Sequence, residues 1–179
     1  MTTTVEAVVG LGSNQGDRVA RVRGAVEALG RLPGTRVAGV SRCYRTPAWG
    51  VLEQPDFINA AVLLRTTLGP VVLLEAMLGI ERTAGRVRSA DGTDRWGPRV
   101  LDLDLLLFGD QHIDVPGLTV PHPYLHERAF ALVPLLEVWP DAVIPGRGPA
   151  REALAGLATG AIEALPYADD PATPRAPRN

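Results

Sequence analysis

Apolar residues occur along the chain in short runs separated by polar segments rich in glycine and proline. Runs of this length that are rich in β-branched residues and bounded by turn residues are typical of buried strands. The runs that we predict to be strands cover residues 5–12, 36–46, 57–68 and 100–108.

Other segments show the 3.6-residue period of a helix. Apolar residues recur at this spacing between 19 and 32, with Ser13 and Asn14 as candidate caps, and Pro70 suits the first turn of a helix that ends near Ala84. Further helices are predicted from about Glu127 and over 150–158. The order β-α-β-β-α-β predicts an α+β, ferredoxin-like sandwich: an antiparallel sheet with helices on one face and additional C-terminal helices. The other face is left for loops or ligand.

The chain has 179 residues, which fits a single domain over 1–167 with a disordered tail at 168–179. A net charge of −2 gives no overall attraction to nucleic acid or to an anionic membrane. No run of about 18 apolar residues predicts a membrane span, and the N-terminus does not have the pattern of a signal peptide. Cys43 is the single cysteine, so a disulfide within the chain is excluded. We expect a cytoplasmic monomer.

All 18 basic residues are arginine. The absence of lysine excludes a P-loop and Schiff-base chemistry. Phosphate would have to be bound by arginine, metal and backbone amides, although a genome that favours arginine codons also explains the bias.

Two aspartates interrupt the apolar run 100–108. With a period of two, Asp102 and Asp104 share one strand face with Leu106 and Phe108, roughly 7 Å apart. Mg²⁺ prefers such hard oxygen ligands and uses one or two carboxylates together with substrate phosphates. The alternative is a pair of solvated aspartates on an open sheet face.

The polar segment 85–99 precedes this strand and is long for a structureless loop. It contains glycines, one tryptophan and several arginines: Arg86, Arg88, Arg95, Trp96 and Arg99. Arginine binds phosphate oxygens in a bidentate manner, so a mobile loop of this kind beside paired carboxylates suits phosphoryl transfer. A charged, solvated loop is the alternative.

Phe57 and Asn59 lie on one face of the predicted strand 57–68, opposite the core face. An aromatic ring and an amide can stack on a flat heterocycle and bind its edge, although an isolated asparagine is more often an ordinary strand residue. Near the third helix, His122 and His126 have i, i+4 spacing without a third metal ligand, so zinc is disfavoured. His122 lies between prolines and could donate a hydrogen bond to a phosphate oxygen.

The chain resembles the 6-hydroxymethyl-7,8-dihydropterin pyrophosphokinases of folate biosynthesis, from about Ala7 to Asp141. The matching stretches are GLGSN, YRTPAWG…QPDFINA, GRVR…RWGPRVLDLDLLLFG and LTVPHPYLHERAFALVPL. The resemblance implies a ferredoxin-like fold and a transferase that moves pyrophosphate from ATP to the hydroxymethyl group of the pterin and releases AMP. It implies two Mg²⁺ ions as cofactors.

The resemblance also implies roles for individual residues. The two metal-binding aspartates are Asp102 and Asp104, and with Arg86 and Arg99 they form the catalytic set. The pterin-binding set is Thr46, Trp49, Phe57, Asn59, Trp96 and Phe130. The ATP-binding set is Glu81, Arg86, Arg88, Leu105, Thr119, His122 and Arg128.

Two features depart from the family pattern. The segment 85–99 is a few residues longer than in many relatives, and Pro123 replaces a tyrosine found in some of them. Two other functions fit parts of the sequence: a metal-dependent phosphohydrolase or nuclease, and a non-catalytic ferredoxin-like ligand-binding module. Release of AMP only in the presence of pterin would distinguish the transferase from the hydrolase.

Overall fold

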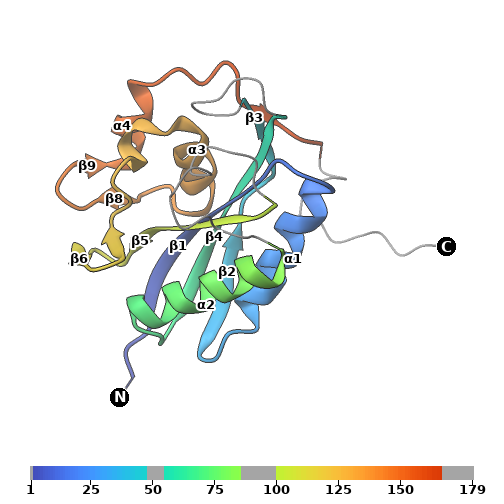
Figure 1. Ribbon diagram of the computed structural model, residues 1–179. Coiled ribbons are helices and arrows are strands. Elements are labelled where there is room, and N and C mark those ends of the chain that lie inside the picture. The colour runs from blue at the N-terminus through green and yellow to red at the C-terminus, as the bar shows by residue number, and fades with distance from the viewer. Residues whose placement is uncertain (1, 48–54, 86–99, 167–179) are drawn as a thin grey trace.

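The computed structural model describes residues 2–47, 55–85 and 100–166. An antiparallel sheet forms the centre of the molecule, with strand order β10-β3-β4-β1-β5 and with β2 also paired to β4 (Figure 1). The strands of this sheet are β1 (Val5–Ser13), β2 (Thr35–Val40), β3 (Tyr44–Thr46), β4 (Phe57–Thr66), β5 (Asp102–Phe108) and β10 (Glu163–Ala164). The predicted class, a mixed α/β protein with an antiparallel sheet, is confirmed.

The central strands are apolar on both faces because both faces are covered. Strand β1 pairs with β4 from Val5 opposite Thr66 to Ser13 opposite Ile58. Its alternate residues belong to two different hydrophobic clusters, with Val9 in one and Val8 in the other. The continuous apolar run in the sequence therefore reflects a strand that is buried on both sides.

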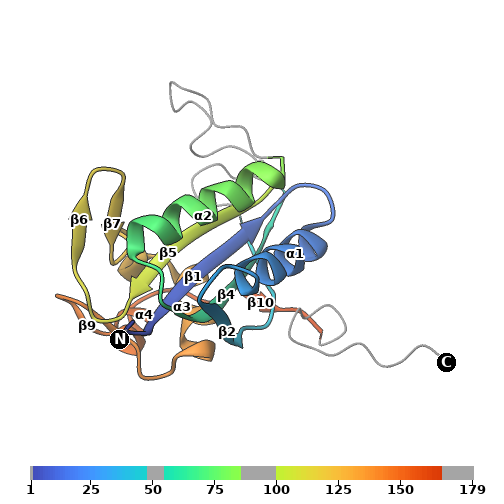
Figure 2. The same cartoon turned by 90° about the horizontal axis from the view of Figure 1, so that it is seen from below.

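Helices α1 (Arg18–Gly30) and α2 (Pro70–Thr83) lie side by side on one face of the sheet (Figure 2). Their apolar sides meet alternate residues of β1, β4 and β5 in the larger cluster, whose helical members include Val22, Leu29, Leu73 and Met77. Pro70 occupies the first turn of α2, as its fixed φ and missing N–H predict.

A third helix covers part of the opposite face, which we had expected to be left for loops or ligand. Helix α3 (Ala129–Val138) follows the 3-10 turn η1 (Leu125–Glu127) and packs Leu132 and Leu135 against Ala61 and Leu63 of β4. Most residues of α3 are apolar, so the helix must bury these side chains against a face of the sheet. The prediction that this face is left for loops or ligand is therefore wrong, and the short helix α4 (Ala150–Ala155), like α3 one of the predicted C-terminal helices, adds to this second layer.

The run 36–46 forms two strands where we predicted one. Strand β2 ends at Val40 and β3 begins at Tyr44. Between them, the buried Ser41 side chain accepts a hydrogen bond from the backbone N–H of Ala61, which a regular ladder would bind through a carbonyl. The predicted caps of α1 are also wrong, because Asp17 accepts the capping hydrogen bond from Ala20 N.

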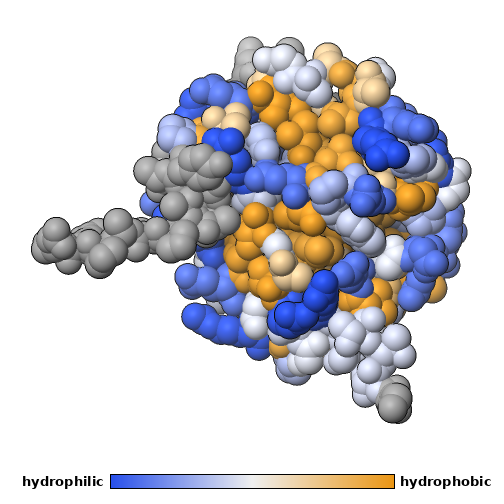
Figure 3. Space-filling view, turned by 180° about the vertical axis from the view of Figure 1, so that it is seen from behind, coloured by the Kyte–Doolittle hydropathy of each residue, from blue (hydrophilic) through white to orange (hydrophobic). Residues whose placement is uncertain are grey.

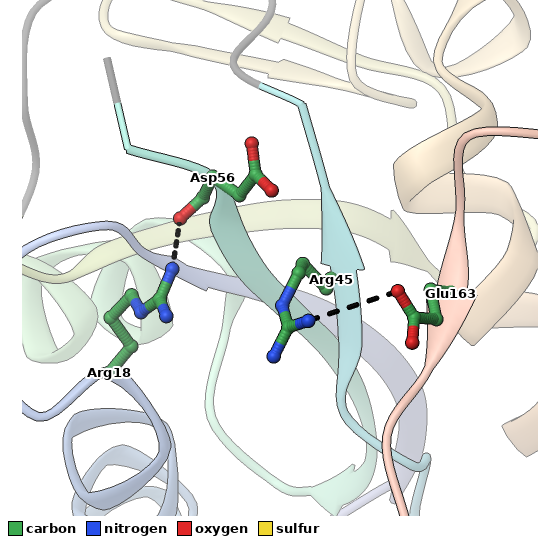
Figure 4. Close-up of polar contacts among 4 residues, drawn as sticks. All are labelled: Arg18, Arg45, Asp56 and Glu163. Atoms are coloured by element: carbon green, nitrogen blue, oxygen red, sulfur yellow. Dashed lines mark hydrogen bonds and ion pairs between the residues drawn. The ribbon is translucent and has the colours of Figure 1, made fainter.

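The described residues also form several short strands, which the hydrophobic pattern did not indicate. They are β6 (Ile113–Val115) with β7 (Leu118–Val120), β8 (Val143–Ile144) with β9 (Gly148–Pro149), and β10 at the edge of the main sheet. Arg45 of β3 faces Glu163 of β10 at 3.8 Å across this edge (Figure 4). Arg45 is about half exposed and Glu163 largely exposed, so the ion pair adds little to stability.

None of the helices in the described ranges is long and apolar enough to span a bilayer. Seen from the side opposite to Figure 1, apolar surface is interrupted by hydrophilic side chains (Figure 3).

Candidate functional site

One row of residues crosses three strands on the face that α3 partly covers. Asn59 of β4 lies opposite Gly12 of β1, and Gly12 lies opposite Asp102 of β5. Directly opposed residues of an antiparallel pair project to the same face, and neighbouring strands are about 4.8 Å apart. The predicted pterin-binding amide and the first predicted metal ligand are therefore about 10 Å apart, one on each side of β1.

Glycines form the centre of this site. Gly12 separates Asn59 from Asp102, and in the next row Gly10 lies between Ala61 and Asp104. A Cβ atom on Gly12 would lie only 2.9 Å from Asn59 Oδ1 and 3.6 Å from Phe57 Cδ1. The missing side chain leaves space for the Asn59 amide and keeps the middle of the site flat. Sequence reasoning gave these glycines no role, although the GLG pattern within a strand was the available signal.

Three of the predicted pterin-binding residues come together on the β4 side. Asn59 Nδ2 donates a hydrogen bond of 2.6 Å to Thr46 Oγ1, and these two side chains are buried. Phe57 is half-buried and projects to the same face two residues before Asn59. The predicted alternation of β4 is confirmed, since Ile58 lies in the core beneath α1 and α2.

A hydrogen bond to α3 fixes the side chain of Tyr44, which lies two residues before Thr46 in β3. Tyr44 lies opposite Asn59 in the β3–β4 pair, and its hydroxyl donates a hydrogen bond to the Glu137 carboxylate. The other oxygen of Glu137 accepts the backbone N–H of Arg42 at 3.1 Å. Sequence reasoning missed both Tyr44 and Glu137, because no local pattern indicates that a helix some 90 residues later reaches β3.

Both aspartates of β5 are half-buried on the site face, whereas Leu103 and Leu105 between and after them are buried on the other. This part of the predicted alternation is confirmed. It holds as far as Leu106 and fails after it, because a bulge there lets Val9 pair with Leu105 and Val8 with Leu107.

The bulge reverses the predicted faces of the last two strand residues. Leu107 joins Leu106 in the cluster beneath α3. Phe108 lies in the opposite cluster, away from the aspartates.

The donor set at Asp102 and Asp104 fits Mg²⁺. Two carboxylates share a half-buried face with glycine backbone beside them, and Mg²⁺ needs few protein ligands because water and phosphate oxygens complete its shell. In the described ranges no group of three His, Cys, Asp or Glu side chains could enclose an ion. His126, considered above for zinc, has its Nε2 3.4 Å from the carboxylate of Glu127.

His122 lies close to β5 and is neutral at physiological pH. Its backbone N–H donates to Leu106 O at 3.1 Å. Burial lowers the pKa of His122 from 6.5 to about 4, helped by the positive charge of Arg128 and opposed by the negative charge of Asp102. Its Nδ1 accepts the backbone N–H of Tyr124 at 3.2 Å, so the proton of the neutral ring is on Nε2.

Arg128 lies at the start of α3 beside two aromatic rings. Its guanidinium carbon is 5.4 Å from the ring centroid of Tyr124 and 5.7 Å from that of Phe130. Phe130 packs against the α3-side cluster, so it belongs to the same sheet face as Phe57. The electrostatic effects on His122 place Arg128, His122 and Asp102 in one neighbourhood.

The structure places three of the predicted ATP-binding residues elsewhere. Leu105 is buried in the cluster beneath α1 and α2, and Glu81 of α2 accepts the backbone N–H of Leu103 at 3.2 Å from that side. Thr119 is exposed on β7. These three assignments stay predictions. The predicted site residues Trp49, Arg86, Arg88, Trp96 and Arg99 lie outside the described residues.

The fold and this face suit a class of protein: a mixed α/β enzyme whose sheet carries a carboxylate pair on one side of β1 and an amide with aromatic rings on the other. The comparison with known families gives the same class. Residues 8–140 match the model of the family described as 7,8-dihydro-6-hydroxymethylpterin-pyrophosphokinase, and the chain belongs to this family. This confirms the predicted family and its enzyme class, pyrophosphoryl transfer in folate biosynthesis.

Similar proteins carry the corresponding enzyme name. The 2-amino-4-hydroxy-6-hydroxymethyldihydropteridine pyrophosphokinase of Methylorubrum extorquens is 50% identical over 157 residues, covering 88% of this chain and 96% of that one. The enzyme of the same name from Pseudomonas aeruginosa is 44% identical over 160 residues, covering 89% and 96%.

Solved structures support the fold. A Plasmodium falciparum HPPK-DHPS structure with pteroate superimposes with a TM-score of 0.66 at 14% identity, covering 87% of this chain and 42% of that one. The chain thus spans less than half the length of that structure.

Proposed function

We propose that the protein transfers the pyrophosphoryl group of ATP to the hydroxymethyl oxygen of 6-hydroxymethyl-7,8-dihydropterin and releases AMP. The observation that carries the proposal is the row Asn59–Gly12–Asp102, which puts an amide site and a carboxylate pair on one face with flat backbone between them. A hydroxymethyl group on a pterin bound at the amide side could extend across Gly12 toward phosphates bound at the carboxylate side.

Asn59 would orient the pterin. One N–H of the Asn59 amide donates to Thr46 Oγ1, and this hydrogen bond sets the orientation of the amide. An amide has a second N–H and an acceptor oxygen, and this pairing suits the alternating donors and acceptors of a pterin edge. Phe57 and Phe130, on the same sheet face, would cover the ring from its two sides.

Asp102 and Asp104 would hold two Mg²⁺ ions, which would neutralise the triphosphate and align its β-phosphorus. Around them, neutral His122 can donate from Nε2 to a phosphate oxygen. Arg128 supplies a permanent positive charge nearby, and the rings of Tyr124 and Phe130 restrict its position. These residues act by positioning and by charge stabilisation, and no covalent nucleophile is needed.

Other expectations complete the proposal. The element order and the sheet order, in which β1 lies between β4 and β5, support a ferredoxin-like βαββαβ arrangement. We propose one domain over 1–167, active as a cytoplasmic monomer. Glu81, Leu105 and Thr119 would lie toward the nucleoside, and Arg86, Arg88, Arg99, Trp49 and Trp96 would act as the resemblance implies.

The decisive experiment is mass spectrometry of the products formed from ATP, Mg²⁺ and the hydroxymethyl-dihydropterin. We expect AMP and the pterin pyrophosphate in equal amounts, with neither product when the pterin is omitted. AMP or ADP formed from ATP alone would favour the phosphohydrolase alternative. Metal-independent binding without any product would favour the ligand-binding module.

A further inference from the structure

The last two residues of the GLGSN motif, Ser13 and Asn14, bind the backbone of two distant segments. Ser13 Oγ donates a hydrogen bond of 2.6 Å to the carbonyl oxygen of Val100. Asn14 Nδ2 donates one of 3.3 Å to the carbonyl oxygen of Pro55. Both residues are buried, with 0% and 2% of their surface exposed. Neither caps α1, so the motif has a different role from the one expected.

Each of the two carbonyl groups lies directly before a strand of the site. Val100 precedes Asp102, the first residue of β5, by two positions, and Pro55 precedes Phe57, the first residue of β4, by two positions. Because β1 lies between β4 and β5 in the sheet, its C-terminal end is within reach of both.

These side-chain bonds continue the sheet where its backbone ladder ends. The last pair between β1 and β5 is Gly12 with Asp102, and the last pair between β1 and β4 is Ser13 with Ile58. Beyond these points the ends of β4 and β5 have no further ladder pair with β1. Ser13 and Asn14 supply the next link on each side, so the starts of both strands stay fixed to β1.

A third contact strengthens the β4 side. Arg18, in the first turn of α1, donates a hydrogen bond of 2.7 Å from Nη1 to the carbonyl oxygen of Asp56 (Figure 4). The residues that lead into β4 are thus held at two successive carbonyl groups, by Asn14 and by Arg18.

We propose that Ser13 and Asn14 are positioning residues for pyrophosphoryl transfer. Ser13 fixes the start of β5 and with it Asp102, whereas Asn14 fixes the start of β4 and with it Phe57 and Asn59. This inference rests on the function proposed above. In-line transfer requires the two substrates to meet at close range, and a displacement of 1 Å can cost about 100-fold in rate. One short segment sets the distance between the two substrate sites.

The test compares Ser13→Ala and Asn14→Ala with a matched control, Thr66→Val. Thr66 is also fully buried, and its hydroxyl bonds Thr35 Oγ1 and Leu68 N, but it lies at the opposite end of β4. The measurements are the melting temperature, the dissociation constants of the pterin and of an ATP analogue with Mg²⁺ by calorimetry, and kcat.

We expect the two variants to separate the two substrate sites. Ser13→Ala should weaken binding of the Mg²⁺-bound analogue and lower kcat roughly tenfold, with pterin affinity within twofold of wild type. Asn14→Ala should weaken pterin binding roughly fivefold to tenfold and leave binding of the analogue within twofold. Thr66→Val should lower the melting temperature by a similar amount without changing either dissociation constant or kcat. Ser13→Thr, which keeps the hydroxyl, should recover most of the lost kcat.

Equal effects on both ligands in Ser13→Ala and Asn14→Ala, or effects no larger than those of Thr66→Val, would overturn the inference and leave these residues with a structural role. Failure of the proposed function is distinguishable, because it would appear in the wild-type protein as an absence of pterin-dependent AMP release.

Discussion

Asp102 and Asp104 lie at two positions of β5 where the neighbouring strand β1 presents only glycine. Two carboxylates on adjacent positions of one strand face repel each other, and removing one of them relieves this repulsion. We expect Asp104→Ala to lower turnover by about 100-fold or more at millimolar Mg²⁺, because charge stabilisation by a bound metal is worth several kcal/mol. The melting temperature should stay the same or rise slightly.

The measurement is AMP release with both substrates saturating, alongside thermal unfolding of the free protein. Asp114, which is exposed on the β6–β7 hairpin, gives a matched control, since Asp114→Ala removes an aspartate from a strand that is not part of the main sheet. Near-normal turnover in Asp104→Ala would rule out its metal-binding role.

His122 leads to a prediction about stability and pH. Its pKa is about 4 in the folded protein, lowered by burial from the ordinary value of 6.5. Between these values the unfolded chain binds a proton that the folded protein does not, so the free energy of unfolding falls as the pH falls from 6.5 toward 4. We expect His122→Gln to remove about 1–2 kcal/mol of the loss seen between pH 7 and pH 5.

Urea unfolding of the free protein at the two pH values measures this effect. His112 is exposed, and His112→Gln is the matched control for the replacement of a histidine by glutamine. An unchanged dependence in His122→Gln would show that the histidine titrates normally.

Single residues also show what sequence can and cannot reveal. The pair Thr46 and Asn59 was predicted on one side of the site, and a hydrogen bond joins the two side chains. Glu137 could not be predicted, because it reaches Tyr44 through a packing of α3 on the sheet that no local pattern encodes. Five of the predicted site residues lie outside the described ranges, so their assignment still depends on the resemblance.

Among the secondary-structure elements, β1 has the most specific sequence requirement. A Cβ atom at position 12 would lie 2.9 Å from Asn59 Oδ1, a distance at which the amide must move. We expect Gly12→Ala to weaken pterin binding about tenfold or more. The displaced Asn59 amide would lose its hydrogen bond either to Thr46 or to the ligand. Titration of the pterin by calorimetry gives the affinity.

The control for this prediction is Gly24→Ala in α1. A Cβ atom there would meet nothing within 4 Å, and alanine favours a helix by about 0.5–1 kcal/mol over glycine. Gly24→Ala should therefore raise the melting temperature without changing pterin affinity. Unchanged affinity in Gly12→Ala would mean that Asn59 does not contact the pterin through its present orientation.

The strands and helices were predictable where their periodicity is regular. Strand β4 alternates without interruption, so the residues of each face are those the sequence indicates, although the face predicted to be more open is also buried. Strand β5 does not, because the bulge at Leu106 shifts the register by one residue, and a run of three leucines contains no signal that would reveal it. The small strands β6 to β10 are too short to show any period.

For the molecule as a whole, the element order predicted the central sheet but not the second layer. Helices α1 and α2 have the apolar spacing expected of helices packed on one face, and α3 was predicted as a helix without a location. Its position on the other face follows from the need to bury Val8, Ala61 and Leu63, which a one-layer arrangement would leave exposed. The site lies on that same face, where the C-terminal half of β1 meets the starts of β4 and β5.

The two hydrophobic clusters, one on each side of the sheet, give a prediction about metal removal. Both consist of hydrophobic side chains, and the two aspartates are half-buried at the edge of this packing. A chelator should therefore abolish turnover while shifting the melting temperature of the free protein by no more than about 1 °C.

An ATP analogue at 100 times its dissociation constant should add about 2.7 kcal/mol to the free energy of unfolding when Mg²⁺ is present. For a chain of this length that corresponds to roughly 5–10 °C. The same analogue with the chelator should add much less, because no metal ions would then lie between the triphosphate and the two carboxylates. Thermal unfolding in the four combinations of analogue and Mg²⁺ provides the measurement. A fall in the melting temperature on chelation alone would assign the metal a structural role, and equal stabilisation by the analogue with and without Mg²⁺ would place the triphosphate away from Asp102 and Asp104.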